Sequence, residues 1–361
     1  MTIKLDNPIM TNEMIEAAVY SLQNEYPLFG ESITKFEEEF ARFCNTDYAI
    51  SVGSGSDALM ISLIAIGVKG KQVLTTPMSY IATANTVFHA GAEPVFADVM
   101  KNGNIDPVEI KKKLTKDKKI GAIVPVHLHG YPAKMNEIME LADDIPVIED
   151  ACQAHGARYF GKRVGSIGKV GCFSFNPVKN MTVGGTAGMV VTNDEELAKK
   201  IRMLADAGRK DIYSHEHEMI GFSSRINTVN AAIGRIQLRD LDKWNENRRK
   251  AANEYLKKLE GIDWFELPSC EKNIEPVYNK FAIKTNKRDE LNEFLLKYGI
   301  DCDGHYKIPI HLHPPYLKMG YKKGDYPNAE KFANTTLSLP LHPEIRMEEI
   351  EEVCTMIRQF R

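Results

Sequence analysis

The first half of the chain alternates short apolar runs with amphipathic segments, and this alternation restricts the folds that the chain can adopt. Five short apolar runs, which we expect to be strands, cover residues 48–52, 72–76, 94–98, 122–126 and 147–150. Helix-like segments separate them at 57–66, 81–89, 107–114 and 135–141. Short buried strands that alternate with helices predict an α/β fold, with a mostly parallel sheet and helices on both of its faces.

The rest of the chain predicts a helical N-terminal segment and a smaller second domain. Helical patterns cover residues 11–43, with a break at 26–30. Further strand candidates are 171–175, 188–192 and 277–283, and further helix candidates are 194–207, 228–259, 287–298 and 348–360. The Lys/Glu-rich run 245–258 indicates a solvated helix face. We therefore expect a large domain over residues 1–235 and a smaller C-terminal α+β domain over residues 236–361.

Composition and charge exclude several classes of function. The 361 residues carry a formal net charge of −3, which gives no basic footprint for nucleic acid. Six cysteines are scattered without a C-x-x-C pair, as expected for reduced thiols rather than a disulfide framework. The N-terminus shows no apolar signal core, and the longest apolar stretch, 58–68, is too short to span a bilayer. We therefore expect a cytoplasmic protein without membrane association.

A Gly/Ser turn joins the first apolar run to the helix-like segment that follows, and its residues suit an anion. Gly53 and Gly55 allow backbone N–H groups to approach a ligand closely, and a helix start adds a partial positive charge. With Ala58, the turn also fits the dinucleotide pattern G-x-G-x-x-A, which makes a nicotinamide enzyme a competing interpretation. That pattern requires an acid about 20 residues further on, and no Asp or Glu occurs between Asp57 and Glu93. The sequence therefore favours a cradle for a single phosphate over a nicotinamide site or a plain tight turn.

Two later segments carry the groups that pyridoxal phosphate (PLP) requires. The first reads E-D-A-C-Q-A-H-G and supplies Asp150 and Gln153, and the second reads S-F-N-P-V-K-N. The second segment supplies Ser174 and Lys179. The PLP aldehyde needs a lysine amine, its pyridine nitrogen a carboxylate, and its phosphate hydroxyl and backbone donors. Taken singly, the acid is equally consistent with a helix N-cap and the lysine with a surface side chain, but their occurrence together with the Gly/Ser turn predicts a PLP site.

Three histidine pairs at i, i+2 raise the question of a metal site. They are His127 with His129, His215 with His217, and His311 with His313. Such a pair can share one face of a strand, but no H-E-x-x-H motif, cysteine pair or acidic calcium loop accompanies any of them. We therefore predict no metal centre.

The chain resembles the DegT/DnrJ/EryC1/StrS family of sugar aminotransferases over nearly its whole length. The E-D-x-x-Q-x-H-G and S-F-x-x-x-K-N segments carry the most specific part of the resemblance. The other matching segments are 26–30, 53–59, 76–85, 125–130, 231–234, 305–306 and 338–341, with Gly208 and Arg225. The resemblance implies an aspartate-aminotransferase-like fold (PLP fold type I), with a large PLP-binding domain and a smaller C-terminal domain.

The resemblance also implies roles for the residues of the expected cofactor site. Lys179 would bond covalently to the PLP aldehyde and later shuttle a proton between the substrate carbon and the cofactor. Asp150 would pair with the pyridinium nitrogen, Gln153 would contact the ring near its oxygen, and Tyr80 would stack on the other ring face. The remaining cofactor-binding residues that it implies, around the phosphate, are Gly55, Ser56, Asp57 and Ser174.

A further group of residues is implied to face the substrate or a neighbouring subunit. Family members are usually homodimers whose active sites draw on both subunits, so Ser223 and Arg225 are expected to reach toward the neighbour's cofactor. The substrate-binding residues implied are Phe29, His305 and Tyr306.

The chain departs from the family pattern at three positions. Thr186 stands where an acid is usual, Ser223 where an asparagine is usual, and His129 where an aromatic residue is common. These departures are consistent with a subgroup that acts on a different sugar.

The resemblance implies a PLP-dependent aminotransferase that moves an amino group, expected to come from L-glutamate, onto the C3 or C4 keto group of a nucleotide-linked sugar. We expect the nucleotide to be UDP. A PLP-dependent keto-sugar dehydratase of the same family is an alternative, although histidine replaces the lysine there and this chain has Lys179. A PLP-binding regulatory protein without catalysis is a second alternative, because a fold does not determine a function.

Overall fold

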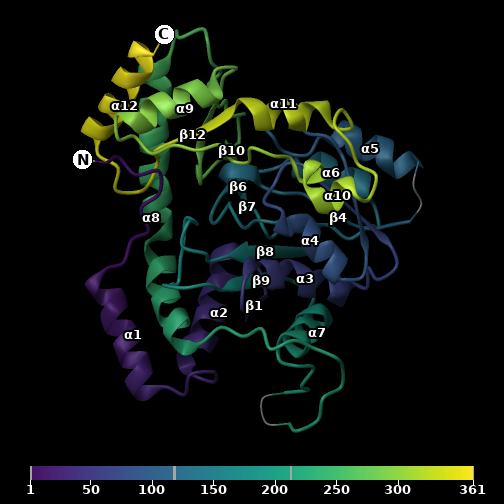
Figure 1. Cartoon of the computed structure of the whole chain (residues 1–361). Helices are drawn as coiled ribbons and strands as arrows, with labels where there is room; N and C mark the ends of the chain where they lie inside the picture. Colours follow the sequence, from purple (N-terminus) through teal and green to yellow (C-terminus); the bar gives the residue numbers. More distant parts are fainter. Residues whose placement is uncertain (1, 117–118, 212–213, 361) are drawn as a thin grey trace.

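A twisted β-sheet forms the centre of the computed structural model (Figure 1), which describes residues 2–116, 119–211 and 214–360. Its strands are β1 (Tyr48–Val52), β2 (Gln72–Thr75), β3 (Glu93–Phe96), β4 (Ile120–Val124), β5 (Ile148–Asp150), β8 (Val170–Ser174) and β9 (Gly188–Thr192). Each of them lies within two residues of a predicted apolar run, so the sequence pattern located the strands of the sheet.

The sheet is mostly parallel, as predicted. One part has the strand order β1-β9-β8-β5 and the other β3-β2-β4. Two parallel bridges, Ile123 with Val147 and Val126 with Asp150, join β4 to β5 and make the parts continuous. Strand β9 runs antiparallel to β1 and β8, whereas the other neighbours are parallel. The carboxyl ends of the parallel strands therefore share one edge, where ligands bind in open α/β sheets.

Helices cover both faces of the sheet, which confirms the α/β prediction. Alternate residues of β9 enter different core clusters: Val190 packs with α3 and α7, whereas Met189 packs with α2. This is the two-residue period of a strand that is buried on both faces. The helices of this part are α1 (Asn12–Asn24), α2 (Glu31–Cys44), α3 (Gly55–Ile66), α4 (Ala82–His89), α5 (Pro107–Lys116), α6 (Met135–Ala142) and α7 (Glu195–Ala205), with the short 3-10 helix η1 (Leu128–Gly130).

Helix α8 (Thr228–Leu259) runs from the sheet to the C-terminal part of the chain (Figure 1). The Asn227 side chain caps its start by accepting the Asn230 N–H at 2.8 Å. The predicted solvated face exists on one side only. Lys250 and other charged residues there are exposed, whereas Arg248 and Tyr255 are buried against the C-terminal core.

The C-terminal part is α+β, as expected, but its strands differ from the prediction. The expected strand at 277–283 begins only at Phe281, because the preceding residues form a loop with Tyr278 in the left-handed region (φ 43°). Strand β12 was not predicted. The remaining elements are β6 (Arg158–Tyr159), β7 (Lys162–Arg163), β10 (Ile274–Glu275), β11 (Phe281–Lys284), α9 (Arg288–Lys297), η2 (Ile310–Leu312), α10 (Pro314–Leu317), α11 (Pro327–Thr335), β12 (Thr336–Leu339) and α12 (Met347–Gln359).

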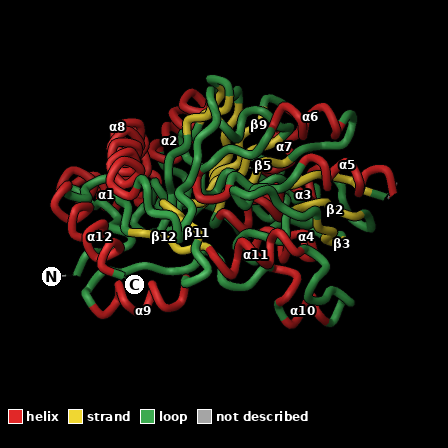
Figure 2. Tube along the Cα trace, turned by 90° about the horizontal axis from the view of Figure 1, so that it is seen from above, coloured by secondary structure: helices red, strands yellow, loops and turns green. Residues whose placement is uncertain are grey.

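Two packing relations connect the N- and C-terminal parts of the chain. Residues of η2, α10 and α11, including Tyr316 and Phe332, share a core cluster with Phe96 of β3. Conversely, the N-terminal segment packs on the C-terminal part, where Ile3 forms a parallel bridge with Ile300 and joins the core around α9 and α12. Both chain ends accordingly lie near α9 and α12 (Figure 2). Within the described residues, no helix combines the length and hydrophobicity that a membrane crossing requires.

Candidate active site

The Gly/Ser turn between β1 and α3 forms a cradle of donors at the carboxyl edge of the sheet. The Ser54 hydroxyl caps α3 by accepting the Asp57 N–H at 3.0 Å. Gly55 and Ser56 form the first turn of the helix, where the backbone offers no carbonyl to their N–H groups. A Cβ added at Gly55 would lie 2.5 Å from Cβ of Ser174, so glycine is required here. The amides of α3 and the hydroxyl of Ser174 thus converge on one place, as an anion site requires.

Asp150 ends β5 at the same edge of the sheet. Its carboxylate is buried, and it accepts hydrogen bonds from the Thr83 hydroxyl at 2.8 Å and the Cys152 N–H at 3.2 Å. The Thr83 hydroxyl is also 2.8 Å from the Ser79 hydroxyl. The acid lines a cavity on its remaining side, so it is held in place and still available to a ligand.

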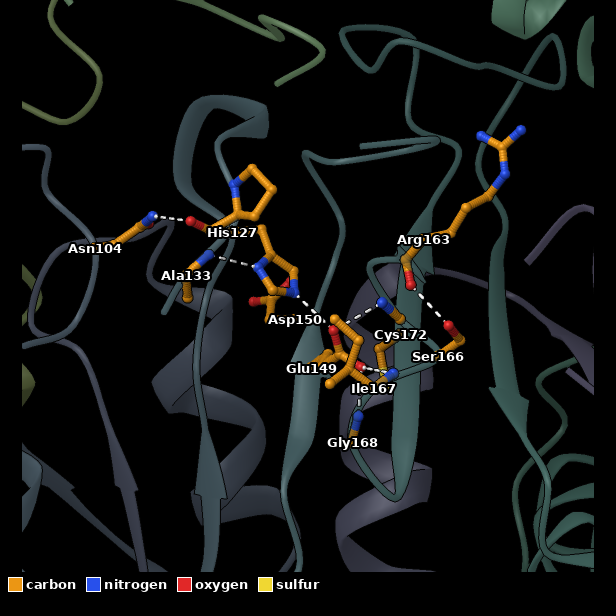
Figure 3. Close-up of polar contacts among 12 residues, drawn as sticks. Asn104, His127, Ala133, Glu149, Asp150, Arg163, Ser166, Ile167, Gly168 and Cys172 are labelled. Carbon is orange, nitrogen blue, oxygen red and sulfur yellow. Dashed lines mark hydrogen bonds and ion pairs between the residues drawn. The ribbon is translucent and has the colours of Figure 1, made fainter. Parts of the chain in front are cut away.

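Glu149, one residue earlier on β5, is not among the residues that line that cavity, and Figure 3 shows its contacts. Its oxygens accept N–H groups from Gly165 at 2.8 Å and from Ile167 and Gly168 at 2.7 Å each. His127 completes the set at 3.0 Å. Because the His127 Nδ1 accepts the Ala133 N–H, its Nε2 carries the hydrogen and donates to Glu149. Four donors therefore satisfy this buried carboxylate within the protein.

Lys179 lies in the loop after β8 and lines the same cavity as Asp150. Its own N–H bonds to the Asn176 carbonyl at 2.9 Å, which closes a tight turn. Asn180 anchors the loop by donating to the Val277 carbonyl at 3.0 Å, and Asn279 donates to the Val178 carbonyl at 3.3 Å. Hydrogen bonds to residues 277–279 of the C-terminal part thus fix the loop that carries Lys179.

Gln153 connects the cavity to residues that lie far away in the sequence. Its Oε1 accepts the His129 N–H at 2.8 Å, and this bond orients its amide so that Nε2 donates to the Tyr306 hydroxyl at 3.4 Å. The His129 Nε2 donates to the His305 carbonyl at 2.9 Å. Burial lowers the pKa of His129 to about 4, so the ring is neutral at pH 7. The rings of Tyr80 and Tyr306, which both line the cavity, contact each other with their centroids 6.0 Å apart.

The cavity has a volume of about 430 Å³ and brings together most of the residues that we predicted for the cofactor and substrate. The predicted residues that line it are Gly55, Ser56, Tyr80, Asp150, Gln153, Ser174, Lys179, His305 and Tyr306. Thr186, where the chain departs from the family pattern, also lines it. Sequence positions from 55 to 306 therefore meet in one place.

Four predicted residues lie outside this cavity. Arg225 pairs with the Asp206 carboxylate at 2.7 Å and stands 5.8 Å from the centre of the Phe29 ring. The Ser223 hydroxyl accepts from Arg225 at 3.5 Å, and the Asp57 carboxylate lies beside Gly53. Within one chain, therefore, none of the four lines the cavity, and their expected roles at the cofactor or, for Phe29, at the substrate stay predictions.

Sequence reasoning missed several polar groups of the cavity wall, and three of them matter for the chemistry below. They are Asp6, Thr83 and Lys280. Thr83 lies inside segment 76–85, which matches the family, so the resemblance could have identified it as a site residue. Asp6 and Lys280 carry no local signal, because they are far apart in the sequence and meet only in the folded chain.

The donor set fits PLP. The observation that decides this is the cradle at Gly55, which a single Cβ would fill and which faces a serine hydroxyl. The buried acid and the loop lysine line the same cavity, and Tyr80, which is 58% exposed, also lines it and can stack on a planar ligand. One phosphate site, one acid and one amine are the groups that this cofactor requires.

Comparisons with known proteins show the family of the chain. A model of the DegT/DnrJ/EryC1/StrS aminotransferase family matches residues 8–358. The dTDP-3-amino-3,4,6-trideoxy-alpha-D-glucose transaminase of Streptomyces venezuelae is 40% identical over 337 residues, which cover 92% of this chain and 88% of that protein. The pleiotropic regulatory protein of Geobacillus stearothermophilus is 40% identical over 339 residues, covering 92% and 90%.

A solved structure supports the fold directly. The crystal structure of S. venezuelae DesV in complex with a ketimine intermediate has a TM-score of 0.93 and 39% sequence identity, and the match covers 96% of this chain and 94% of that chain. This agreement confirms the expected PLP fold type I.

Proposed function

The chain belongs to the DegT/DnrJ/EryC1/StrS aminotransferase family of PLP-dependent enzymes, and we propose that it transfers an amino group from L-glutamate to the C3 keto group of a nucleotide-linked sugar. The observation that carries this proposal is the shared cavity of Lys179, Asp150 and the Gly55 cradle. The choice of C3 over C4 draws on the Streptomyces venezuelae relative, whose name specifies a 3-amino sugar.

Each cavity residue has a task in this reaction. When bound, PLP supplies an aldehyde and an electron-withdrawing ring, which stabilises negative charge at the substrate carbon. Asp150 would keep the ring nitrogen protonated, and Lys179 would hold the aldehyde and then move a proton at the substrate carbon. Tyr80 would pack on one ring face, and Gln153 would contact the ring near its oxygen. The phosphate would lie against the amides of α3 and the Ser174 hydroxyl.

The two alternatives are disfavoured by specific residues. The family's dehydratases have histidine in place of the lysine, whereas Lys179 is present and lines the cavity. A regulatory role is raised by the name of the Geobacillus relative. A protein that only bound PLP would not need a lysine free to act as a base, and the complete set of acid, amine and donors supports catalysis.

Three finer expectations are part of the proposal. We propose UDP as the nucleotide, although the Streptomyces relative is named for a dTDP-linked sugar, so both nucleotides belong in the assay. We also propose a homodimer, in which Arg225 and Ser223 of one subunit approach the cofactor of the other. A cytoplasmic location is proposed because nucleotide sugars are made there.

Glutamate alone provides the direct test. The PLP-loaded protein mixed with L-glutamate should lose the absorbance of the aldehyde form and gain that of the pyridoxamine form, and a 3-keto nucleotide sugar should reverse the change. Lys179→Ala should abolish both conversions, whereas Lys162→Ala, at an exposed lysine of β7, should behave as wild type. A Lys179→Ala protein that still transaminates would overturn the proposal, and no conversion with any common donor would favour the regulator.

A further inference from the structure

A second lysine lies in the wall of the cavity that holds Lys179. The Lys280 side chain is only 6% exposed, and its ammonium forms an ion pair with the Asp6 carboxylate, whose side chain is 23% exposed. Both residues line the cavity. A buried ion pair contributes little to stability on balance, because desolvation opposes the attraction between its charges. Its position on the wall of a ligand site therefore points to a functional role.

The chain holds this pair from both sides. Asn279, next to Lys280, donates to the Val178 carbonyl next to Lys179, at 3.3 Å, so the two lysines sit on loops that are bonded together. Asp6 follows the N-terminal bridge of Ile3 to the C-terminal part, where Leu5 N–H donates to Asp301 at 3.3 Å. The backbone segments that carry Lys280 and Asp6 are thus each fixed by hydrogen bonds to another part of the chain.

Within one chain, the proposed reaction needs a cation that the assigned residues do not supply, since Arg225 is proposed to approach the cofactor of the other subunit. An amino-acid donor carries a carboxylate, and an ionised carboxylate entering a partly closed cavity requires a charged partner. Among the described residues that line the cavity, the lysine side chains are Lys179 and Lys280, and there is no arginine. Lys179 would be engaged with the cofactor aldehyde. Lys280 is the cation that remains.

We propose that Lys280 binds the carboxylate of the amino-acid donor, with Asp6 holding its ammonium in place when no donor is bound; the idea rests on the proposed function. An ammonium has three N–H donors, and Asp6 is the single carboxylate that pairs with it among the described residues. Two donors therefore remain for a ligand. Asp6 also opposes the effect of burial, which is the largest cause of the lowered pKa of Lys280.

The reaction has two halves, one with the amino-acid donor and one with the keto sugar, and a residue that binds the donor carboxylate should affect only the first. Lys280→Met, which removes the charge and keeps the length, should lower kcat/KM for glutamate by at least about tenfold. The reaction of the pyridoxamine form with the keto sugar should change by less than about twofold, and Lys280→Arg should keep most of the glutamate reaction. Lys284→Met, at a lysine of β11 that pairs with Glu266 outside the cavity, is the matched control and should leave both halves unchanged.

Binding of an unreactive dicarboxylate provides a readout that is independent of turnover. Glutarate has no amino group, and calorimetric titration of the PLP-loaded protein should give a Kd at least about tenfold weaker in Lys280→Met than in Lys284→Met. If the single variant does not fold because Asp6 is left unpaired, the double variant Asp6→Asn/Lys280→Met removes both charges and should show the same loss.

The outcomes distinguish this inference from the proposed function. Unchanged glutamate kinetics and glutarate affinity in the folded variant would overturn the role of Lys280, and so would a loss confined to the keto-sugar half. If no amino acid converts the PLP of the wild-type protein to the pyridoxamine form, the proposed function would instead be contradicted. In that case the glutarate titration would still decide whether Lys280 binds a carboxylate.

Discussion

Glu149 and Asp150 are adjacent carboxylates on one strand, both buried, and the protein treats them in opposite ways. Glu149 accepts four hydrogen bonds from His127 and from backbone amides of the 165–168 loop (Figure 3). Asp150 accepts from Thr83 and the Cys152 N–H, and its remaining side lines the cavity. A buried carboxylate that the protein satisfies completely stabilises the fold, whereas one with acceptor capacity facing a cavity is available to a ligand.

The largest expected effect is on stability, at the satisfied carboxylate. Glu149→Gln removes the charge and places an NH₂ group against donors that now lack an acceptor. We expect a loss of about 3–5 kcal/mol in the free energy of unfolding, measured by urea denaturation. PLP should still react with Lys179 in whatever fraction remains folded. A variant with wild-type stability and no activity would contradict the contrast with Asp150.

Asp150→Asn should show the opposite pattern. The amide keeps the shape, its oxygen can accept the Cys152 N–H, and its NH₂ group can donate to the Thr83 hydroxyl, so we expect the free energy of unfolding to change by less than about 1 kcal/mol. The charge that would hold the ring nitrogen protonated is lost, and kcat with glutamate should fall on the order of 10²–10³-fold. Equal losses of stability in the Glu149 and Asp150 variants would remove the distinction between them.

Thr83→Val tests how much of the acid's role depends on its orientation. The hydroxyl donates to Asp150 at 2.8 Å, and valine keeps the shape without the donor. We expect kcat to fall about tenfold, since a hydrogen bond to a charged group contributes about 1.5–3 kcal/mol. Thr86→Val is the matched control, because among the described residues the Thr86 hydroxyl bonds to the carbonyl of Thr83 in its own helix, at 3.1 Å, and to no other group. Its activity should stay within about twofold of wild type.

A further effect concerns the pH dependence of stability. His155 packs between Phe173 and Phe175, and burial lowers its pKa from 6.5 to about 3, with the charge of Lys179 as the second cause. In the unfolded chain His155 is protonated below about pH 6.5, whereas in the folded protein it stays neutral down to about pH 3. The free energy of unfolding therefore falls as the pH falls through this window. This residue should remove about 2 kcal/mol of stability between pH 8 and pH 5.

Replacing the His155 ring tests whether this histidine lowers the free energy of unfolding at acid pH. His155→Phe keeps an aromatic ring between the two phenylalanines, so its unfolding free energy should decline less steeply on acidification than that of wild type. The exposed His89→Gln serves as control and should retain the wild-type slope. A His155→Phe protein with the wild-type slope would show that this histidine does not titrate as burial implies.

The residues of the cavity that could be predicted all belong to local patterns. Gly55 sits in a strand-turn-helix segment, Asp150 ends an apolar run, and Lys179 follows a serine in a short motif. The same locality explains why the sheet strands were found. Strand β12 was missed because its alternating run, Thr336–Leu339, is only four residues long and pairs with β11 more than fifty residues earlier.

The residues that could not be predicted depend on long-range folding. Asp6 and Lys280 are separated by 274 positions, and their ion pair exists only because the N-terminal segment bonds to the C-terminal part. The resemblance named Phe29 and Arg225, yet in one chain they contact each other outside the cavity. Whether they reach a cofactor depends on a second subunit, which the sequence of one chain does not place.

The account depends most directly on which amine holds the cofactor, because two lysines line the cavity. Borohydride reduction of the PLP-loaded protein traps the bond between the aldehyde and an amine as a permanent mass increase. Peptide mass spectrometry should place that mass on Lys179 and leave Lys280 unmodified. The mass on Lys280, or on neither lysine, would contradict the assignment of the site.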